Sequence, residues 1–141
     1  LLGRRDNAPV FLYGLVGFLL AYFTYGVTFV LAAGISMVWG ILAGVLFLVG
    51  IFQYRTFRTL PHALRIPVLL YLGVVSFFFT SAATFAFRES TLYPFLGGLG
   101  IYSSDSLIAH NLYRKPLPRS DLWILPPYYI GQICVVLSAI G

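Results

Sequence analysis

Residues 7–54 read NAPVFLYGLVGFLLAYFTYGVTFVLAAGISMVWGILAGVLFLVGIFQY and contain no charged side chain. As a single α-helix these 48 residues would extend roughly 72 Å, about twice the thickness of the hydrocarbon core of a bilayer. The stretch must therefore fold back once. Gly34, with Ser36 close behind it, is the best candidate for the turn, because glycine readily adopts the left-handed conformation that ends many helices. The sequence thus predicts one helix at about residues 10–33 and a second at about 35–54.

The rest of the chain continues this alternation of apolar runs and short polar connections. It predicts further helices at about residues 66–87, 92–113 and 122–140. Of the 141 residues, 60% are hydrophobic and 9% are charged, whereas a soluble domain averages about 25% charged residues, so a water-soluble globular protein is excluded. We expect an all-α fold, a polytopic bundle of five transmembrane helices that forms one domain over residues 1–141. Because the only methionine is Met37, we also expect the chain to be part of a longer one.

The positions of the basic residues predict how these helices are oriented. With five alternating spans, the N-terminus and the loops 55–65 and 114–121 share one side, which then holds eight of the nine Lys and Arg residues, and the other side holds only Arg88. By the positive-inside rule the basic side faces the cytoplasm, or the matrix of an organelle. In a soluble protein the net charge of +5 would raise nucleic acid as a partner. Here we expect membrane lipids as partners and no nucleic acid; which membrane is involved stays open.

Small residues indicate where these helices approach one another. The second helix carries Gly40 and Gly44 four residues apart, and the fourth contains the run Gly97-Gly98-Leu99-Gly100. In lipid, helices associate through close packing, which glycine permits. We therefore predict helix contacts at both places, with the alternative that glycine is simply common in membrane helices.

One acidic residue lies well inside a predicted span. Asp105 precedes Arg114 by nine residues and so lies about 13 Å along the helix from the basic end. A carboxylate at that depth costs at least about 2.5–3.5 kcal/mol on insertion scales, and such residues usually face the bundle interior or a wet cavity. On the same helical face, Ala109 leaves space for a ligand or water. Asp105 is therefore a candidate catalytic acid.

The structural alternative is that Asp105 only joins helices together, through hydrogen bonds to hydroxyl groups on neighbouring helices. The candidate partners for that role are Thr24, Thr28, Thr80 and Thr84. The spacing of His, Cys, Asp and Glu residues offers no pair of metal ligands one helical turn apart here, and Cys134 is the only cysteine. We expect neither a metal ion nor a cofactor.

The last helix contains two consecutive prolines, within Leu125-Pro-Pro-Tyr-Tyr-Ile-Gly-Gln132. Proline lacks a backbone N–H and is best tolerated in the first turn of a helix. We therefore expect either a kinked helix or an irregular segment before Pro126. Gln132, one turn after Tyr128, would point inward, and the region would form a cavity wall. The alternative is that Tyr128 and Tyr129 are an interfacial tyrosine pair.

The run Ser104-Asp-Ser-Leu-Ile-Ala-His-Asn111, followed by RKPLPRSDLWILPPYYIGQ up to Gln132, resembles the lysoplasmalogenase (YhhN-like) family of integral membrane proteins. Members of that family pair a helix containing Ser-Asp with a helix containing Leu-Pro-x-Tyr-Tyr-x-x-Gln. The stretch Phe18-Leu-Leu-Ala-Tyr22 is similar to the family's Phe-Leu-Leu-Ala-His, with tyrosine in place of the histidine. The resemblance extends over essentially the whole chain and is strongest over the last forty residues.

This resemblance implies an eight-span protein of which the present chain is the C-terminal part. The family's Gly-Asp motif would then precede Leu1. It also implies hydrolysis of the vinyl ether bond of lysoplasmalogen, which yields a fatty aldehyde and a glycerophospho head group. Asp105 would be one of two catalytic carboxylates. The substrate-binding residues would be Tyr128, Tyr129, Gln132 and Asn111. The alternative from another class is a non-catalytic accessory subunit of a larger membrane complex, with protein partners.

Overall fold

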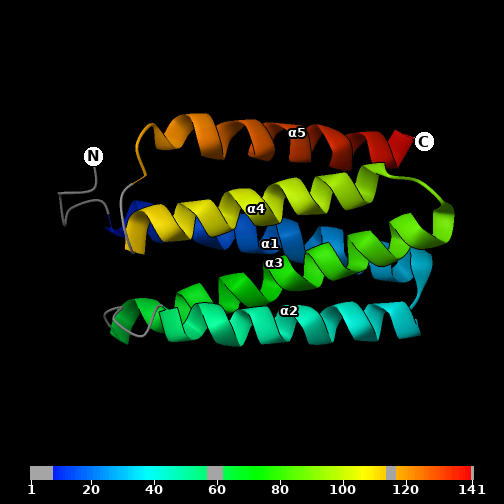
Figure 1. Cartoon of the computed structure of the whole chain (residues 1–141), viewed down its shortest axis with the longest axis horizontal. Coiled ribbons are helices and arrows are strands. Elements are labelled where there is room, and N and C mark those ends of the chain that lie inside the picture. Colours follow the sequence, from blue (N-terminus) through cyan, green and yellow to red (C-terminus); the bar gives the residue numbers. More distant parts are fainter. Residues whose placement is uncertain (1–7, 57–61, 114–116, 141) are drawn as a thin grey trace.

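The computed structural model describes residues 8–56, 62–113 and 117–140, and these form five α-helices without a strand in the described ranges. The helices are α1 (Ala8–Ala33), α2 (Met37–Thr56), α3 (His62–Glu89), α4 (Tyr93–Tyr113) and α5 (Ser120–Ile140). They run up and down alongside one another (Figure 1). All five predicted helices are present. The largest difference in bounds is at α3, which begins four residues before the predicted start because Pro67 is accommodated inside the helix.

The turn between the first two helices lies where the sequence predicts it. Gly34 has a φ of 74°, in the left-handed region that a side chain would disfavour. The hydroxyl oxygen of Ser36 accepts a hydrogen bond from the backbone N–H of Trp39 at 3.3 Å and so caps the start of α2. At the same end, the guanidinium of Arg88 donates to the carbonyl oxygen of Ala33, the last residue of α1. This contact ties the C-terminal end of α3 to the turn.

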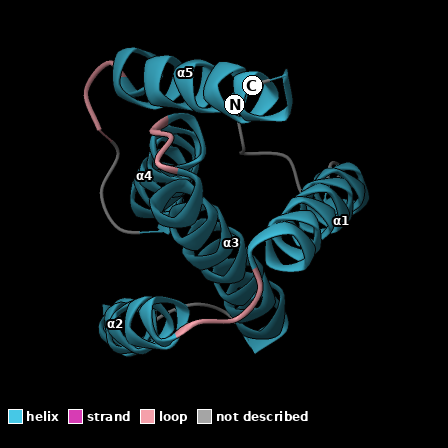
Figure 2. Ribbon diagram, turned by 90° about the vertical axis from the view of Figure 1, so that its right-hand side faces the viewer, coloured by secondary structure: helices cyan, strands magenta, loops and turns pink. Residues whose placement is uncertain are grey.

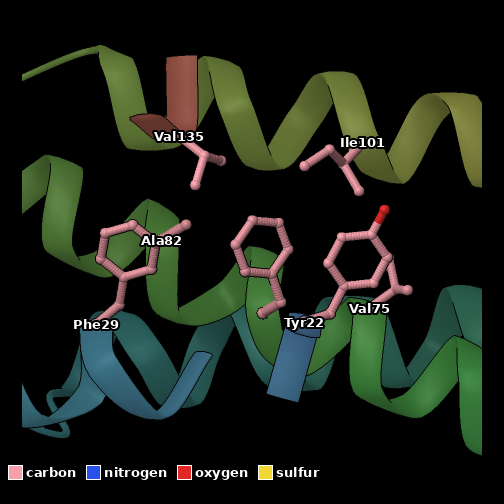
Figure 3. Packing of buried hydrophobic residues seen from close by; sticks show 7 residues of the cluster. Tyr22, Phe29, Val75, Ala82, Ile101 and Val135 are labelled. Atoms are coloured by element: carbon pink, nitrogen blue, oxygen red, sulfur yellow. The ribbon is translucent and has the colours of Figure 1, made fainter. Parts of the chain in front are cut away.

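The helix α3 occupies the middle of the bundle and contacts α1, α2 and α4, while α5 packs against α4 (Figure 2). The backbones of α1 and α4 do not come close to each other along the described chain. Large side chains fill the space between them instead. Figure 3 shows this core, to which α1, α3, α4 and α5 all contribute. Its buried members are Tyr22, Phe29, Val75, Phe78, Ala82, Ile101 and Val135.

Four helices contain segments that are long and apolar enough to cross a membrane, consistent with a multi-pass membrane protein. The segments are Tyr13–Ala33, Met37–Arg55, Arg65–Glu89 and Ser120–Ile140. Among the described helices, α4, the remaining expected span, does not meet this criterion. The reason is its polar second half, which includes Ser103, Ser104, Asp105 and Ser106. The end of α2 and the starts of α3 and α5 lie at one end of the bundle, and the end of α3 lies at the other (Figure 1). Arg55, Arg65 and Arg119 are close in sequence to the first three of these helix ends, and Arg88 is close to the end of α3.

The glycines of α4 meet α5 closely, as predicted. A methyl group placed on Gly100 would lie 2.6 Å from the carbonyl oxygen of Pro127, and one placed on Gly131 would lie 2.9 Å from the backbone nitrogen of Ile101. Only glycine permits this separation of the two backbones. The predicted contact at Gly40 and Gly44 is wrong for the described chain, because a methyl group on either residue would meet no atom within 4 Å.

The helix α2 is the most loosely packed of the five. Among the described helices it contacts only α3. A groove of about 510 Å³ runs between the two helices, lined mostly by apolar side chains and without an acidic one. The Gly-xxx-Gly pattern of α2 therefore makes no close helix contact among the described residues.

Candidate functional site

Asp105 faces the interior of the bundle, as the sequence predicts, with 5% of its surface exposed. It lies at the wall of a cavity of about 290 Å³. The cavity is bounded by side chains from α1, α3, α4 and α5, so residues distant in the sequence meet there. Those that line it are Gly14, Leu15, Phe18, Tyr22, Val68, Tyr71, Leu72, Asp105, Ile108, Ala109 and Tyr128. Ala109, one helical turn after Asp105, also lines the cavity, and its small side chain leaves space beside the carboxyl group, as the sequence predicts.

Among the described residues, one carboxyl oxygen of Asp105, Oδ2, is buried and has no hydrogen-bond partner. Three of the four threonines considered as partners use their hydroxyl groups elsewhere. Thr24, Thr28 and Thr84 each donate to a carbonyl oxygen one turn earlier in their own helices, at 2.8–2.9 Å. Because almost all buried polar groups in proteins are hydrogen-bonded, an unpaired carboxyl oxygen facing a cavity indicates a site for a bound molecule.

Three tyrosines surround Asp105, each from a different helix. The hydroxyl group of Tyr71, on α3, lies within interaction range of the carboxyl group. Tyr22 comes from α1 and Tyr128 from α5, and both line the same cavity. The amide group of Gln132 lies close to the hydroxyl groups of Tyr22 and Tyr128. The cavity therefore has one polar wall, and the rest of its lining is apolar.

The helix α5 is continuous from Ser120 to Ile140, with Pro126 and Pro127 inside it. An irregular segment before Pro126, one of the two predicted possibilities, is therefore wrong. The missing N–H groups of the prolines leave carbonyl oxygens of the first turns without their usual donors. Nearby, the hydroxyl of Ser104 donates to the carbonyl oxygen of Ile124 at 3.0 Å and joins α4 to α5.

The structure brings only some of the predicted binding residues to the cavity. Tyr128 lines it, and Gln132 lies behind it beside two of the tyrosines. Tyr129 is 60% exposed on the outer face of α5, where its ring contacts that of Tyr128 edge-on at 5.5 Å. The side-chain oxygen of Asn111 accepts a hydrogen bond from the backbone N–H of Leu117 at 2.7 Å, away from the cavity. Asn111 thus joins the end of α4 to the loop residue Leu117, which precedes α5.

Asn111→Ala is expected to lower stability by about 1 kcal/mol, the usual worth of such a hydrogen bond, and to leave substrate affinity unchanged. Thermal unfolding in detergent measures the first effect, and the KM of the purified variant measures the second. A KM raised severalfold at unchanged stability would instead assign Asn111 to substrate binding.

Sequence reasoning missed Tyr71 and the apolar residues Val68, Leu72 and Ile108 as cavity residues. Tyr71 and Val68 lie in a run of mostly apolar side chains on α3, where one tyrosine has no distinguishing pattern. The available signal was helical spacing, since Val68, Tyr71 and Leu72 are three and four residues apart and share a face. That spacing does not show which neighbouring helix the face meets.

Comparison with known proteins gives one match. Residues 1–139 match the model of the YhhN family. No curated protein and no solved structure gives a significant match to the chain.

Proposed function

The chain belongs to the YhhN family, the lysoplasmalogenase family, and from this premise we propose that it hydrolyses the vinyl ether bond of lysoplasmalogen. The products are a fatty aldehyde and a glycerophospho head group. One observation carries the proposal: Asp105 places an unpaired carboxyl oxygen at a cavity whose lining is otherwise largely apolar. Such a cavity suits the hydrocarbon part of a lipid, and a carboxylic acid is the group that the reaction needs.

The chemistry of a vinyl ether, R–CH=CH–O–R′, explains why one acid suffices to start the reaction. Asp105 transfers its proton to the carbon farther from the ether oxygen, and the carbon next to that oxygen becomes an oxocarbenium ion. The carboxylate left behind stabilises the cation and accepts a proton from the water that attacks it. The resulting hemiacetal breaks into the aldehyde and the alcohol. Overall one water is consumed, and Asp105 ends in its starting state.

The neighbouring tyrosines act on the same region of the substrate. Tyr71 lies next to the carboxyl group and orients it, and the ring of Tyr128 contacts that of Phe18 edge-on at 6.4 Å across the cavity. We assign Tyr128 to contact with the substrate, and Gln132 to holding the hydroxyl group of Tyr128 in position. The other described acidic residues, Glu89 and Asp121, are exposed near helix ends, so Asp105 is the carboxylate of this cavity among the described residues.

The substrate is a membrane lipid, and the protein meets it in the bilayer. We further propose that the end of the bundle with Arg55, Arg65 and Arg119 faces the cytoplasm or an organelle matrix. Labelling of single cysteines introduced near Arg119 and near Arg88 in sealed vesicles tests this orientation. Protection of the Arg119 end from an impermeant reagent added outside a right-side-out vesicle is the expected result.

The function is tested with the full-length protein in detergent or nanodiscs. Aldehyde release is expected from lysoplasmalogen and not from the matched lysolipid with a saturated alkyl ether, which has no double bond to protonate. A well-folded protein that releases no aldehyde from either lipid contradicts the enzymatic function. If it also purifies in a stoichiometric complex, the accessory-subunit alternative is favoured.

A further inference from the structure

The hydroxyl group of Tyr22 is a second buried polar group without a hydrogen bond. Only 1% of the surface of Tyr22 is exposed, and its hydroxyl oxygen has no partner among the described residues. Gln132 lies nearby without forming a hydrogen bond of normal geometry. A tyrosine this deeply buried normally finds a partner for its O–H, so the unpaired hydroxyl calls for an explanation.

The ring of Tyr22 is fixed on several sides. It stacks on Phe78 with the centroids 5.6 Å apart and an interplanar angle of 20°, and on Phe18 at 6.0 Å and 28°. Tyr71 contacts it at 6.4 Å. Held in this way, the ring cannot turn its hydroxyl toward another partner. Figure 3 shows the hydroxyl of Tyr22 pointing from α1 toward α4.

The two residues that carry these unpaired oxygen atoms line the same cavity. Tyr22 and Asp105 both line the space of about 290 Å³, one from α1 and the other from α4. A water molecule occupies about 30 Å³ of liquid and needs two or more polar partners. The cavity has room for a water at its polar wall beside the hydrocarbon part of a ligand, and the apolar remainder of its lining offers water no alternative position.

We propose that Tyr22 and Asp105 together hold the water molecule that completes the hydrolysis, an inference that rests on the proposed function. The water donates one hydrogen to Oδ2 of Asp105 and the other to the hydroxyl oxygen of Tyr22, so that a lone pair faces the oxocarbenium carbon. When the new C–O bond forms, the proton on the first hydrogen bond passes to Asp105, which gave its own proton to the substrate. Tyr22 exchanges no proton. It is a positioning residue.

Tyr22→Phe tests this role because it removes the hydroxyl and keeps the ring. Methanol at low volume fraction competes with water for the oxocarbenium ion and gives a stable mixed acetal, which mass spectrometry distinguishes from the aldehyde. In the variant we expect kcat for aldehyde release to fall about tenfold. We also expect the acetal-to-aldehyde ratio to rise about two- to tenfold, the effect of losing one hydrogen bond to the water.

Tyr25→Phe is the matched control. Tyr25 is on the same helix and contacts the same Phe78 ring at 6.1 Å, but it does not line the cavity. Its variant should show the wild-type ratio. If Tyr22→Phe lowers the yields of acetal and aldehyde equally, the hydroxyl has only a structural role and the proposal is overturned.

A second measurement is independent of turnover. An experimental structure that resolves ordered water is expected to show one bound between the hydroxyl of Tyr22 and Oδ2 of Asp105, and to lose it in Tyr22→Phe. A structure without that water overturns the proposal even if the wild-type protein releases aldehyde. Conversely, the water can be present in a protein that releases none. In that case only the enzymatic function, and with it the role of the water in hydrolysis, is refuted.

Discussion

Asp105→Asn is expected to lower kcat for aldehyde release by about 10²- to 10⁴-fold, the usual contribution of a general acid–base group. Asparagine has nearly the shape of aspartic acid but cannot give a proton to the vinyl ether carbon, and its neutral amide does not stabilise the cation that follows. The KM should change little, because the apolar lining that holds the substrate stays intact.

The control for this prediction is Asp121→Asn, in the exposed first turn of α5. There the carboxylate is exposed, its favourable interaction with the helix terminus is worth about 0.3–1 kcal/mol, and activity should remain at the wild-type level. Aldehyde release is followed with both proteins at equal concentration, after size-exclusion chromatography has shown that each is folded. An Asp105→Asn protein that turns over at the wild-type rate would remove Asp105 from the mechanism.

Gly131→Leu is expected to destabilise the protein by about 3 kcal/mol or more, at the upper end of what overpacking costs. A side chain at this position meets the backbone of α4, namely the nitrogen of Ile101 at 2.9 Å and the carbonyl oxygen of Gly97 at 3.0 Å. Backbone atoms cannot move aside as a flexible side chain does. The two helices must separate, and Tyr128 would then leave its place opposite Asp105.

Gly44→Leu provides the comparison, because a side chain added there meets no described atom within 4 Å. We expect it to leave stability unchanged or to increase it slightly, since replacing a helical glycine favours the helix. Thermal unfolding in one detergent measures both variants. Equal unfolding temperatures for the two would show that the close contact between α4 and α5 contributes little to stability.

Much of the fold follows from local features that the sequence displays directly. The uncharged run of residues 7–54 is too long for one span and contains one glycine suited to a turn, and the structure has its turn there, with Gly34 at a φ of 74°. Contacts between helices are harder to predict. Gly40 and Gly44 show the same spacing as many packing motifs, yet a methyl group on either would meet no described atom within 4 Å, because the spacing provides a smooth helix face without specifying a partner for it.

The candidate site likewise has features that the sequence predicts and features that it does not. The cost of placing a carboxyl group in lipid predicts that Asp105 faces inward, and its burial agrees. The depth of Tyr22 and the place of Tyr71 beside the carboxyl depend on how α1 and α3 are rotated against α4, which no spacing within one helix reveals. Tyr129 directly follows the cavity residue Tyr128 and is among the predicted substrate-binding residues, but it points outward. Successive residues of an α-helix are rotated by about 100°, so neighbours in the sequence need not share a face.

Among the described helices α2 contacts only α3, and this has a consequence for how the sequence can vary over evolutionary time. In lipid, an apolar side chain without a protein neighbour can be exchanged for another at little cost, because the acyl chains adapt to its shape. The positions of α2 turned away from α3 should therefore drift freely among Leu, Val, Ile and Phe in related proteins. Gly100 and Gly131, where α4 and α5 touch, should admit almost no exchange at all. In related proteins, the variability of a position is thus expected to depend more on how closely its helix approaches a neighbour there than on how hydrophobic its side chain is.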